Sequence, residues 1–223
     1  MSGYAAAMPS SAAMVAAPPP ARRGRPRKSA EQRDESLRRA DLVRAAARLF
    51  RTQGFDATST RDIAAAIGMQ SGSPFYYFES KSALLFAVMQ DGMAQAQASQ
   101  DAALRALGAR APARERLRAL IRQHYEVLLG EGSDFIPVML YEWRSLTPAQ
   151  REAVAAQKDA YEAAWMPALR ALHRAGHLNA PPALARLFIF GALNWTVQWF
   201  DPAGPRTLDD LTEQALCLFV GKA

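Results

Sequence analysis

The stretch from residue 54 to residue 78 constrains the fold of this chain more than any other. Ser59-Thr60-Arg61-Asp62 has the spacing of a capping box, in which the serine and aspartate side chains satisfy free backbone N–H groups at a helix start. Apolar residues follow at helical spacing, and Gly68 ends the pattern. A further short helix is expected from Ser71 to Phe78, with a later start as the alternative, because Pro74 disfavours helical backbone at Ser73. Two short helices joined by a glycine-containing turn indicate a helix-turn-helix.

The rest of the chain also reads as helices. A helix with one apolar stripe is expected over 36–53, and Gly54 stops it. Glycine and proline breaks then predict helices over 81–107, 112–130, 134–144, 148–176, 181–200 and 207–221. No segment shows a strand pattern. We therefore expect an all-α protein, with a three-helix helix-turn-helix domain followed by a helical C-terminal domain.

The positive charge is unevenly distributed. The net charge is +6, and half of the residues are apolar, an ordinary value for a globular protein. Residues 1–90 hold 13 basic and 7 acidic side chains, whereas residues 91–223 hold 14 of each. Most of the excess lies in residues 22–39. A basic front and a neutral rear suggest that the front meets a polyanion and the rear does something else.

Several classes of protein are excluded. The single cysteine, Cys217, rules out a disulfide scaffold and indicates a reducing compartment. The three histidines lack a second ligand type at metal spacing, so neither a metal site nor a cofactor is expected. The longest uncharged apolar stretch, 187–200, is too short to span a bilayer, and no secretory signal is present, so a cytoplasmic protein without a membrane partner is expected. No catalytic set appears, which argues against an enzyme.

The composition of the second short helix suits DNA. Its sequence is Ser71-Gly72-Ser73-Pro74-Phe75-Tyr76-Tyr77-Phe78. Serine and glycine keep its N-terminal end thin, so that backbone N–H groups can approach a phosphate. The tyrosines offer hydroxyl groups for phosphates and rings for thymine methyl groups. Phe75 and Phe78 are expected to point inward.

Residues 45–84 resemble the signature of the TetR family. The matching pattern is Ala45-Ala46-x-x-Leu49-Phe50-x-x-x-Gly54-Phe55-x-x-Thr58-Ser59-x-Arg61-Asp62-Ile63-Ala64-x-x-x-Gly68-Met69, continued by Gly72, Tyr76-Tyr77-Phe78, Ser80-Lys81 and Leu84. The resemblance implies a homodimeric transcriptional regulator. Such proteins join an N-terminal DNA-binding domain to a C-terminal domain that binds a ligand and forms the dimer.

Candidate DNA contacts carry over from the family by position. They are Thr60 and Arg61 in the first short helix, Gln70, Ser71, Gly72 and Ser73 at the entry of the recognition helix, Tyr76 and Tyr77 within it, and Lys81 as a phosphate clamp. Adjacent helical positions differ by about 100°, so at least one of the two tyrosines must be partly exposed. We favour Tyr77 for DNA contact. Lys81 could instead be a solvated lysine.

The basic arm has two readings that the sequence leaves open. Arg23-Gly24-Arg25-Pro26 resembles an AT-hook core, in which Arg23 and Arg25 would enter a narrow minor groove. Alternatively, the arm is a flexible leader that adds nonspecific phosphate attraction. We predict a disordered basic leader over 1–34, a DNA-binding domain over 35–82 and an effector-binding and dimerisation domain over 83–223.

The C-terminal part would then be the sensor. The family resemblance places the dimer contacts on the helices near 181–200 and 207–221. We expect an apolar or acyl-type effector of unknown identity to be held by residues drawn from Tyr125, Met139, Trp143, Tyr161 and Trp165. The leading hypothesis is a repressor that binds a palindromic operator on double-stranded DNA and is released by this effector. An architectural protein that binds DNA constitutively is the rival.

Overall fold

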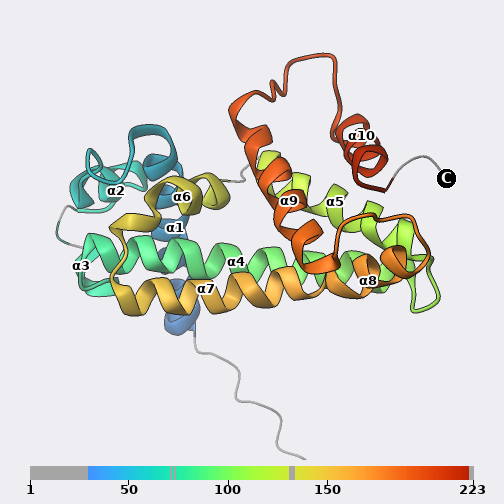
Figure 1. The fold of residues 1–223 in the computed structure, drawn as a ribbon. Coiled ribbons are helices and arrows are strands. Elements are labelled where there is room, and N and C mark those ends of the chain that lie inside the picture. Colours follow the sequence, from blue (N-terminus) through green and yellow to red (C-terminus); the bar gives the residue numbers. More distant parts are fainter. Residues whose placement is uncertain (1–29, 71, 73, 131–133, 221–223) are drawn as a thin grey trace, which may run out of the picture.

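The computed structural model describes residues 30–70, 72, 74–130 and 134–220, and these form helices without a strand (Figure 1). The predicted all-α class is confirmed. The elements are α1 (Ala30–Gln53), α2 (Thr60–Ala66), α3 (Pro74–Tyr77), α4 (Lys81–Leu107), α5 (Ala113–Leu129), α6 (Phe135–Glu142), η1 (Trp143–Ser145), α7 (Pro148–Ala163), α8 (Met166–Arg174), α9 (Pro182–Trp195), η2 (Thr196–Gln198) and α10 (Leu208–Val220). Among the helices described here, none is long and apolar enough to cross a membrane.

The first helix begins earlier than its apolar stripe indicates. α1 starts at Ala30, so residues 30–34 are helical and the prediction that they belong to a disordered leader is wrong. Glu31 lies in the first turn, where an acidic side chain favours the helix dipole. One turn later, Asp34 and Arg38 form an i,i+4 ion pair at 3.1 Å. A polar segment of this kind extends a helix without leaving an apolar pattern in the sequence.

The expected helix over 148–176 is two helices. α7 ends at Ala163, and α8 begins at Met166 after a break at Ala164 and Trp165. Pro167 causes this break because it has no N–H group for the carbonyl of Ala163, and its ring would clash with that carbonyl. The single-helix prediction is therefore wrong, and Pro167 was the signal in the sequence that could have corrected it.

The described residues form two apolar cores that share α4. The first core combines α1, α2 and the first half of α4 with Val138, Leu146 and Val154 from later elements. The second core combines the second half of α4 with α5 and α7 to α10. Phe135 and Met139 of α6 pack against both cores. α4 and α6 therefore connect the helix-turn-helix to the rest of the chain.

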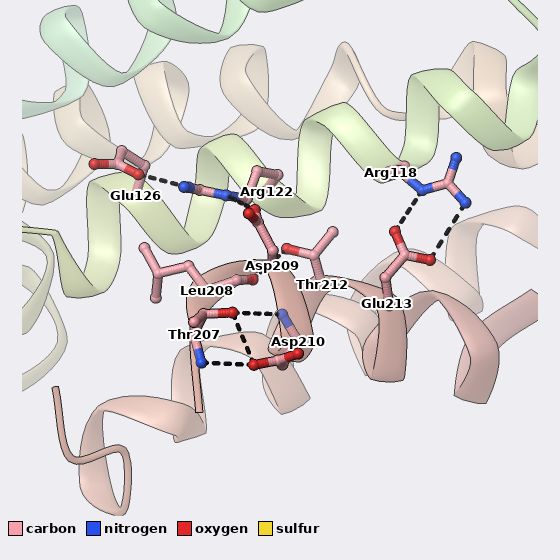
Figure 2. Close-up of polar contacts among 9 residues, drawn as sticks. All are labelled: Arg118, Arg122, Glu126, Thr207, Leu208, Asp209, Asp210, Thr212 and Glu213. Carbon is pink, nitrogen blue, oxygen red and sulfur yellow. Dashed lines mark hydrogen bonds and ion pairs between the residues drawn. The ribbon is translucent and has the colours of Figure 1, made fainter. Parts of the chain in front are cut away.

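Ion pairs join the last helix, α10, to α5, as Figure 2 shows. Thr207 begins α10, because its hydroxyl accepts from the backbone N–H of Asp210 at 3.1 Å while its own N–H donates to the Asp210 carboxylate at 2.8 Å. Arg118 pairs with Glu213 at 2.6 Å, and Arg122 pairs with Asp209 at 2.5 Å. Exposed pairs of this kind stabilise little but fix the register of α10 on α5.

Candidate nucleic-acid interface

The start of α2 is held by the predicted capping box. The Ser59 hydroxyl accepts from the Asp62 N–H at 3.2 Å, and the Ser59 N–H donates to the Asp62 carboxylate at 2.9 Å. The Ser59 hydroxyl also donates to the Asp62 carboxylate at 2.6 Å. This bond and the bond from the Ser59 N–H lower the pKa of Asp62, because they favour its charged form. The cap presents Arg61 as an exposed side chain and Thr60 as a half-exposed one at the first turn of α2.

The turn between α2 and α3 is built on Gly68. Gly68 has φ of +67°, a left-handed conformation that side chains disfavour. Its N–H donates to the Ala65 carbonyl at 3.1 Å, and the Met69 N–H donates to the Ala64 carbonyl at 2.9 Å. This pair of bonds is a Schellman motif. The turn leaves Gln70 and Gly72 exposed, whereas the predicted contacts Ser71 and Ser73 lie outside the described residues.

The recognition helix is shorter than expected. α3 contains only Pro74–Tyr77, so it starts three residues after the predicted cap at Ser71. Pro74 and Phe78, four residues apart, both face the core and are buried. Phe75 is 55% exposed, so the expectation that it points inward is wrong. The reason is geometric, because Phe75 lies about 100° around the helix from the buried Pro74.

The two tyrosines differ in exposure. Tyr76 is 76% exposed, whereas Tyr77 is half-buried and packs against the first core. Their rings meet edge to face with centroids 5.1 Å apart. The Glu35 carboxylate raises the pKa of the Tyr76 phenol, through its charge and through a hydrogen bond with the hydroxyl group. Exposure therefore favours Tyr76 over Tyr77 as the side chain that can reach DNA.

The ammonium group of Lys81 has partners within the protein. It donates to the carbonyl oxygens of Phe55 at 2.7 Å and Thr58 at 2.9 Å, and lies 3.3 Å from that of Asp56. It also lies 4.3 Å from the centroid of the Phe55 ring, a cation–π distance. These carbonyls explain how a lysine is accommodated at the start of α4. Lys81 thus holds the loop between α1 and α2, where sequence analysis expected a phosphate clamp.

Replacing Lys81 with methionine is expected to lower the free energy of unfolding by about 1.5–3 kcal/mol, because charge-assisted hydrogen bonds are lost. Urea unfolding followed by circular dichroism measures this change. Arg170→Met, at an exposed position of α8, is the matched control. Unchanged stability together with a large loss of DNA affinity would instead support the phosphate clamp.

α6 is bonded to the helix-turn-helix at both of its ends. Asp134, just before α6, pairs with Arg51 of α1 at 2.9 Å. Glu142, the last residue of α6, accepts from the backbone N–H of Phe55 at 2.9 Å. Sequence analysis missed both contacts, because partners 83 and 87 residues apart leave no local pattern. Any displacement of α6 therefore acts on the end of α1 and the loop that leads to α2.

A cavity of about 200 Å³ opens between α4, α5, α6, α7 and α9. We call it the effector cavity after the ligand that sequence analysis predicted for some of its lining residues. Two of the predicted ligand residues, Met139 and Tyr161, line it. Trp143 lines an adjoining groove instead. Tyr125 and Trp165 are buried in the second core and line neither of these two spaces. Helical spacing alone cannot tell a core aromatic residue from one that faces a cavity.

The wall of the effector cavity carries a polar cluster that sequence analysis did not identify as such. His124 is hydrogen-bonded to the Tyr161 hydroxyl and to the Asn194 amide oxygen, each at 3.1 Å. Burial lowers the pKa of His124 to about 4, so the ring is neutral at neutral pH. Glu162, also in the wall and buried, pairs with Lys158 at 2.7 Å and with Arg186.

One face of α9 exposes an apolar stripe, and this helix lies in the other half of the molecule from α2 and α3 (Figure 1). The Phe188 side chain is 62% exposed and that of Trp195 is 65% exposed. Leu184, one helical turn before Phe188, is 45% exposed. Gly191 lies in the middle of this stripe, and a methyl group added there would meet no atom within 4 Å. Such a patch is typical of a protein interface.

Two family models match the chain. One, described as bacterial regulatory proteins of the tetR family, covers residues 42–88. The other, described as a tetracyclin repressor-like C-terminal domain, covers residues 110–222, which is more than half of the chain. The chain belongs to the TetR family. It is a DNA-binding transcriptional regulator, as TetR-family proteins are, and its helix-turn-helix is the DNA-binding element.

Relatives of this TetR-family chain include a curated repressor and solved structures. The HTH-type transcriptional repressor KstR2 of Rhodococcus jostii (strain RHA1) is 28% identical over 187 residues, covering 82% of this chain and 90% of the relative. A crystal structure of AibR with isovaleryl coenzyme A and operator DNA has a TM-score of 0.74 at 26% identity, covering 82% and 98% of the two chains. The superantigen PfiT is 38% identical with a TM-score of 0.69, covering 83% and 97%.

Proposed function

We propose that this TetR-family chain is a homodimeric repressor that binds a palindromic operator and releases it when an apolar or acyl-type effector fills the effector cavity. The observation that carries the proposal is the position of α6. This helix lines the cavity through Phe135 and Met139 and is bonded to the helix-turn-helix through Asp134 and Glu142. A constitutive architectural protein would need no such connection between a cavity and its DNA-binding helices.

The proposed DNA surface consists of the exposed side of α2 and α3. Thr60 and Arg61 start α2, Gln70 and Gly72 are exposed after it, and Tyr76 is the most exposed residue of α3 among those predicted. Ser71 and Ser73, outside the described residues, are proposed to contact DNA as well. Tyr77 packs against the first core with its ring edge to face with that of Tyr76, and Lys81 holds the loop before α2. Arg23 and Arg25, outside the described residues, are proposed to add either minor-groove or nonspecific phosphate contacts.

The proposed dimer forms through α9 and α10. The exposed stripe on α9 is supplemented by Leu218 of α10, which is 82% exposed. Burying such side chains against a second copy removes apolar surface from water, which favours association. A dimer of this kind carries two recognition helices, which a palindromic site requires.

The proposed effector enters between α6 and α9. The lining is mainly apolar, with Met93, Ile136 and Phe190 among its members, so the cavity fits an apolar group. The structural neighbour AibR, of similar fold, was crystallised with an acyl thioester, which supports an acyl-type effector here. An effector that moved α6 would shift the loop at Phe55 and thereby the orientation of α2.

Replacing Arg61 or Tyr76 with alanine is expected to weaken operator binding by about 5- to 150-fold, the loss of about 1–3 kcal/mol for a base or phosphate contact. The operator is first selected from genomic DNA with the purified protein, and fluorescence anisotropy then measures the dissociation constants. Arg170→Ala, exposed on α8, is the control and should bind normally. If both variants bind the operator with wild-type affinity, the surface formed by α2 and α3 is not the DNA-binding surface. If none of the acyl compounds tested releases the operator, the architectural alternative is favoured.

A further inference from the structure

A buried glycine lies inside α4, the helix that both cores share. Gly92 is part of this helix of 27 residues, although glycine is poorly favoured in a helix interior because it loses much chain entropy on folding. A Cβ atom at this position would overlap the Phe135 side chain, lying 2.6 Å from its Cβ and closer still to two of its ring atoms. Phe135 therefore packs directly on the backbone of α4, and an alanine in place of the glycine would not allow this approach.

Phe135, the first residue of α6, lies between two spaces. One is the effector cavity. The other is a cleft of about 180 Å³ between α1, α4 and α6, which we call the hinge cleft; its lining includes Val43 and Ala47 of α1 and Gly92 of α4. Phe135 lines both spaces and packs against both cores. Its side chain is therefore a wall that separates the effector cavity from α1.

Two ion pairs join α1 to the two sides of this contact. Asp91, the neighbour of the glycine in α4, pairs with Arg39 at 3.3 Å. Asp134, the neighbour of the phenylalanine, pairs with Arg51 at 2.9 Å. The closeness of α6 to α4 sets the spacing of the two carboxylates, so a separation of these helices must tilt α1 or lengthen one pair. Arg39 also lies 5.0 Å from the centroid of the Phe78 ring, directly after α3, so a tilt of α1 reaches the recognition helix.

We propose that Gly92 is a positioning residue for operator binding. Its bare backbone seats Phe135, and this seat sets the distance between α4 and α6 at which α1 holds the helix-turn-helix in its DNA-binding orientation. Any side chain at position 92 lifts Phe135 off the seat and weakens operator binding without an effector. This inference rests on the proposed function in one respect, namely that the position of α6 controls the helix-turn-helix. It goes further by assigning that control to one contact.

The operator affinity of a Gly92→Ala protein, measured by fluorescence anisotropy, tests this inference. Binding is expected to weaken by about tenfold or more, within the usual range of coupling between two sites. Alanine favours a helix over glycine, so a loss of affinity cannot be assigned to a weaker α4. Ala94→Ser, which adds one atom at an exposed site of the same helix, is the matched control and should bind as the wild type does. Analytical ultracentrifugation should show the same oligomeric state in all three proteins.

A double-mutant cycle separates positioning from a general packing defect. Phe135→Gly removes every atom that the new methyl group would overlap. In this background Gly92→Ala should change operator affinity by less than about twofold, because the two sites no longer interact. Asp134→Asn supplies a variant without any overlap, in case Gly92→Ala does not fold. It breaks the pair with Arg51 and should weaken operator binding by about fivefold, at the lower end of typical coupling.

Three results would overturn the inference. They are wild-type affinity in the Gly92→Ala protein, an equal loss from this substitution with and without Phe135, and wild-type affinity in the Asp134→Asn protein. The proposed function is tested separately, by adding acyl compounds to the wild-type complex with the operator. Weak operator binding by Gly92→Ala, with no release of the wild type by any acyl compound, would support the role of Gly92 and count against the effector. Release of the wild type, with normal binding by Gly92→Ala, would do the reverse.

Discussion

Replacing Gly191 with arginine is expected to leave the protomer folded while preventing its pairing. Gly191 is exposed on α9, and a side chain there meets no atom of its own protomer. Arginine also favours a helix over glycine by about 1 kcal/mol, so α9 itself should not suffer. In a dimer built on the α9 stripe, however, the new side chain would stand between Phe188 and Trp195 where two helices approach closely.

The loss of pairing should reduce operator affinity by about a hundredfold or more, because two linked recognition helices bind far more tightly than one. Analytical ultracentrifugation measures the oligomeric state, and fluorescence anisotropy measures the affinity. Ala156→Arg, at an exposed site on α7, is the matched control and should remain dimeric. A Gly191→Arg protein that still sediments as a dimer would show that the interface lies elsewhere.

Replacing Trp165 with alanine is expected to lower the free energy of unfolding by about 3–5 kcal/mol, the cost of a large cavity in a packed core. Trp165 is fully buried between α7 and α8. Its indole N–H donates to the Gln100 side-chain oxygen at 2.8 Å, and Gln100 in turn donates to the Tyr161 carbonyl at 3.0 Å. The variant therefore also leaves a buried amide oxygen without a donor, which adds to the destabilisation.

Urea unfolding at one fixed protein concentration measures this effect, because the stability of the proposed dimer would depend on concentration. Trp165→Phe is the comparison. It keeps most of the apolar contact but not the hydrogen bond, so its loss should be smaller. A loss below about 1 kcal/mol for Trp165→Ala would contradict the packing described for the second core.

The parts of the fold that sequence analysis predicted correctly are those set by interactions within a few residues. The Ser59 and Asp62 cap and the left-handed Gly68 turn each depend on neighbours along the chain, and both occur as expected. The start of α1 was missed because polar residues 30–34 carry no apolar stripe. The break before α8 was missed because buried apolar residues continue at helical spacing across it, from Tyr161 through Trp165 to Leu169, although Pro167 marks the break.

The functional site was predictable only in part. The α2 and α3 residues follow a continuous pattern, so the family resemblance located them. The acceptors of Lys81 lie 23 to 26 residues away, and the two partners of His124 lie 37 and 70 residues away, so no local pattern could reveal them. Tyr125 and Trp165 look like pocket residues in the sequence, and only their packing shows that they belong to the core.

The sharing of α4 and α6 between the two cores has a consequence for how such regulators can be recombined. A graft that ended at residue 82, the predicted domain boundary, would leave the first core without Leu84 to Met89 of α4 and without Val138, Leu146 and Val154. The helix-turn-helix therefore does not have a complete apolar core of its own when it is separated from the later helices. New DNA specificity is more readily acquired by exchanging exposed side chains such as Arg61 and Tyr76 than by transplanting the whole segment, and chimaeras should carry the α6 contact surface with them.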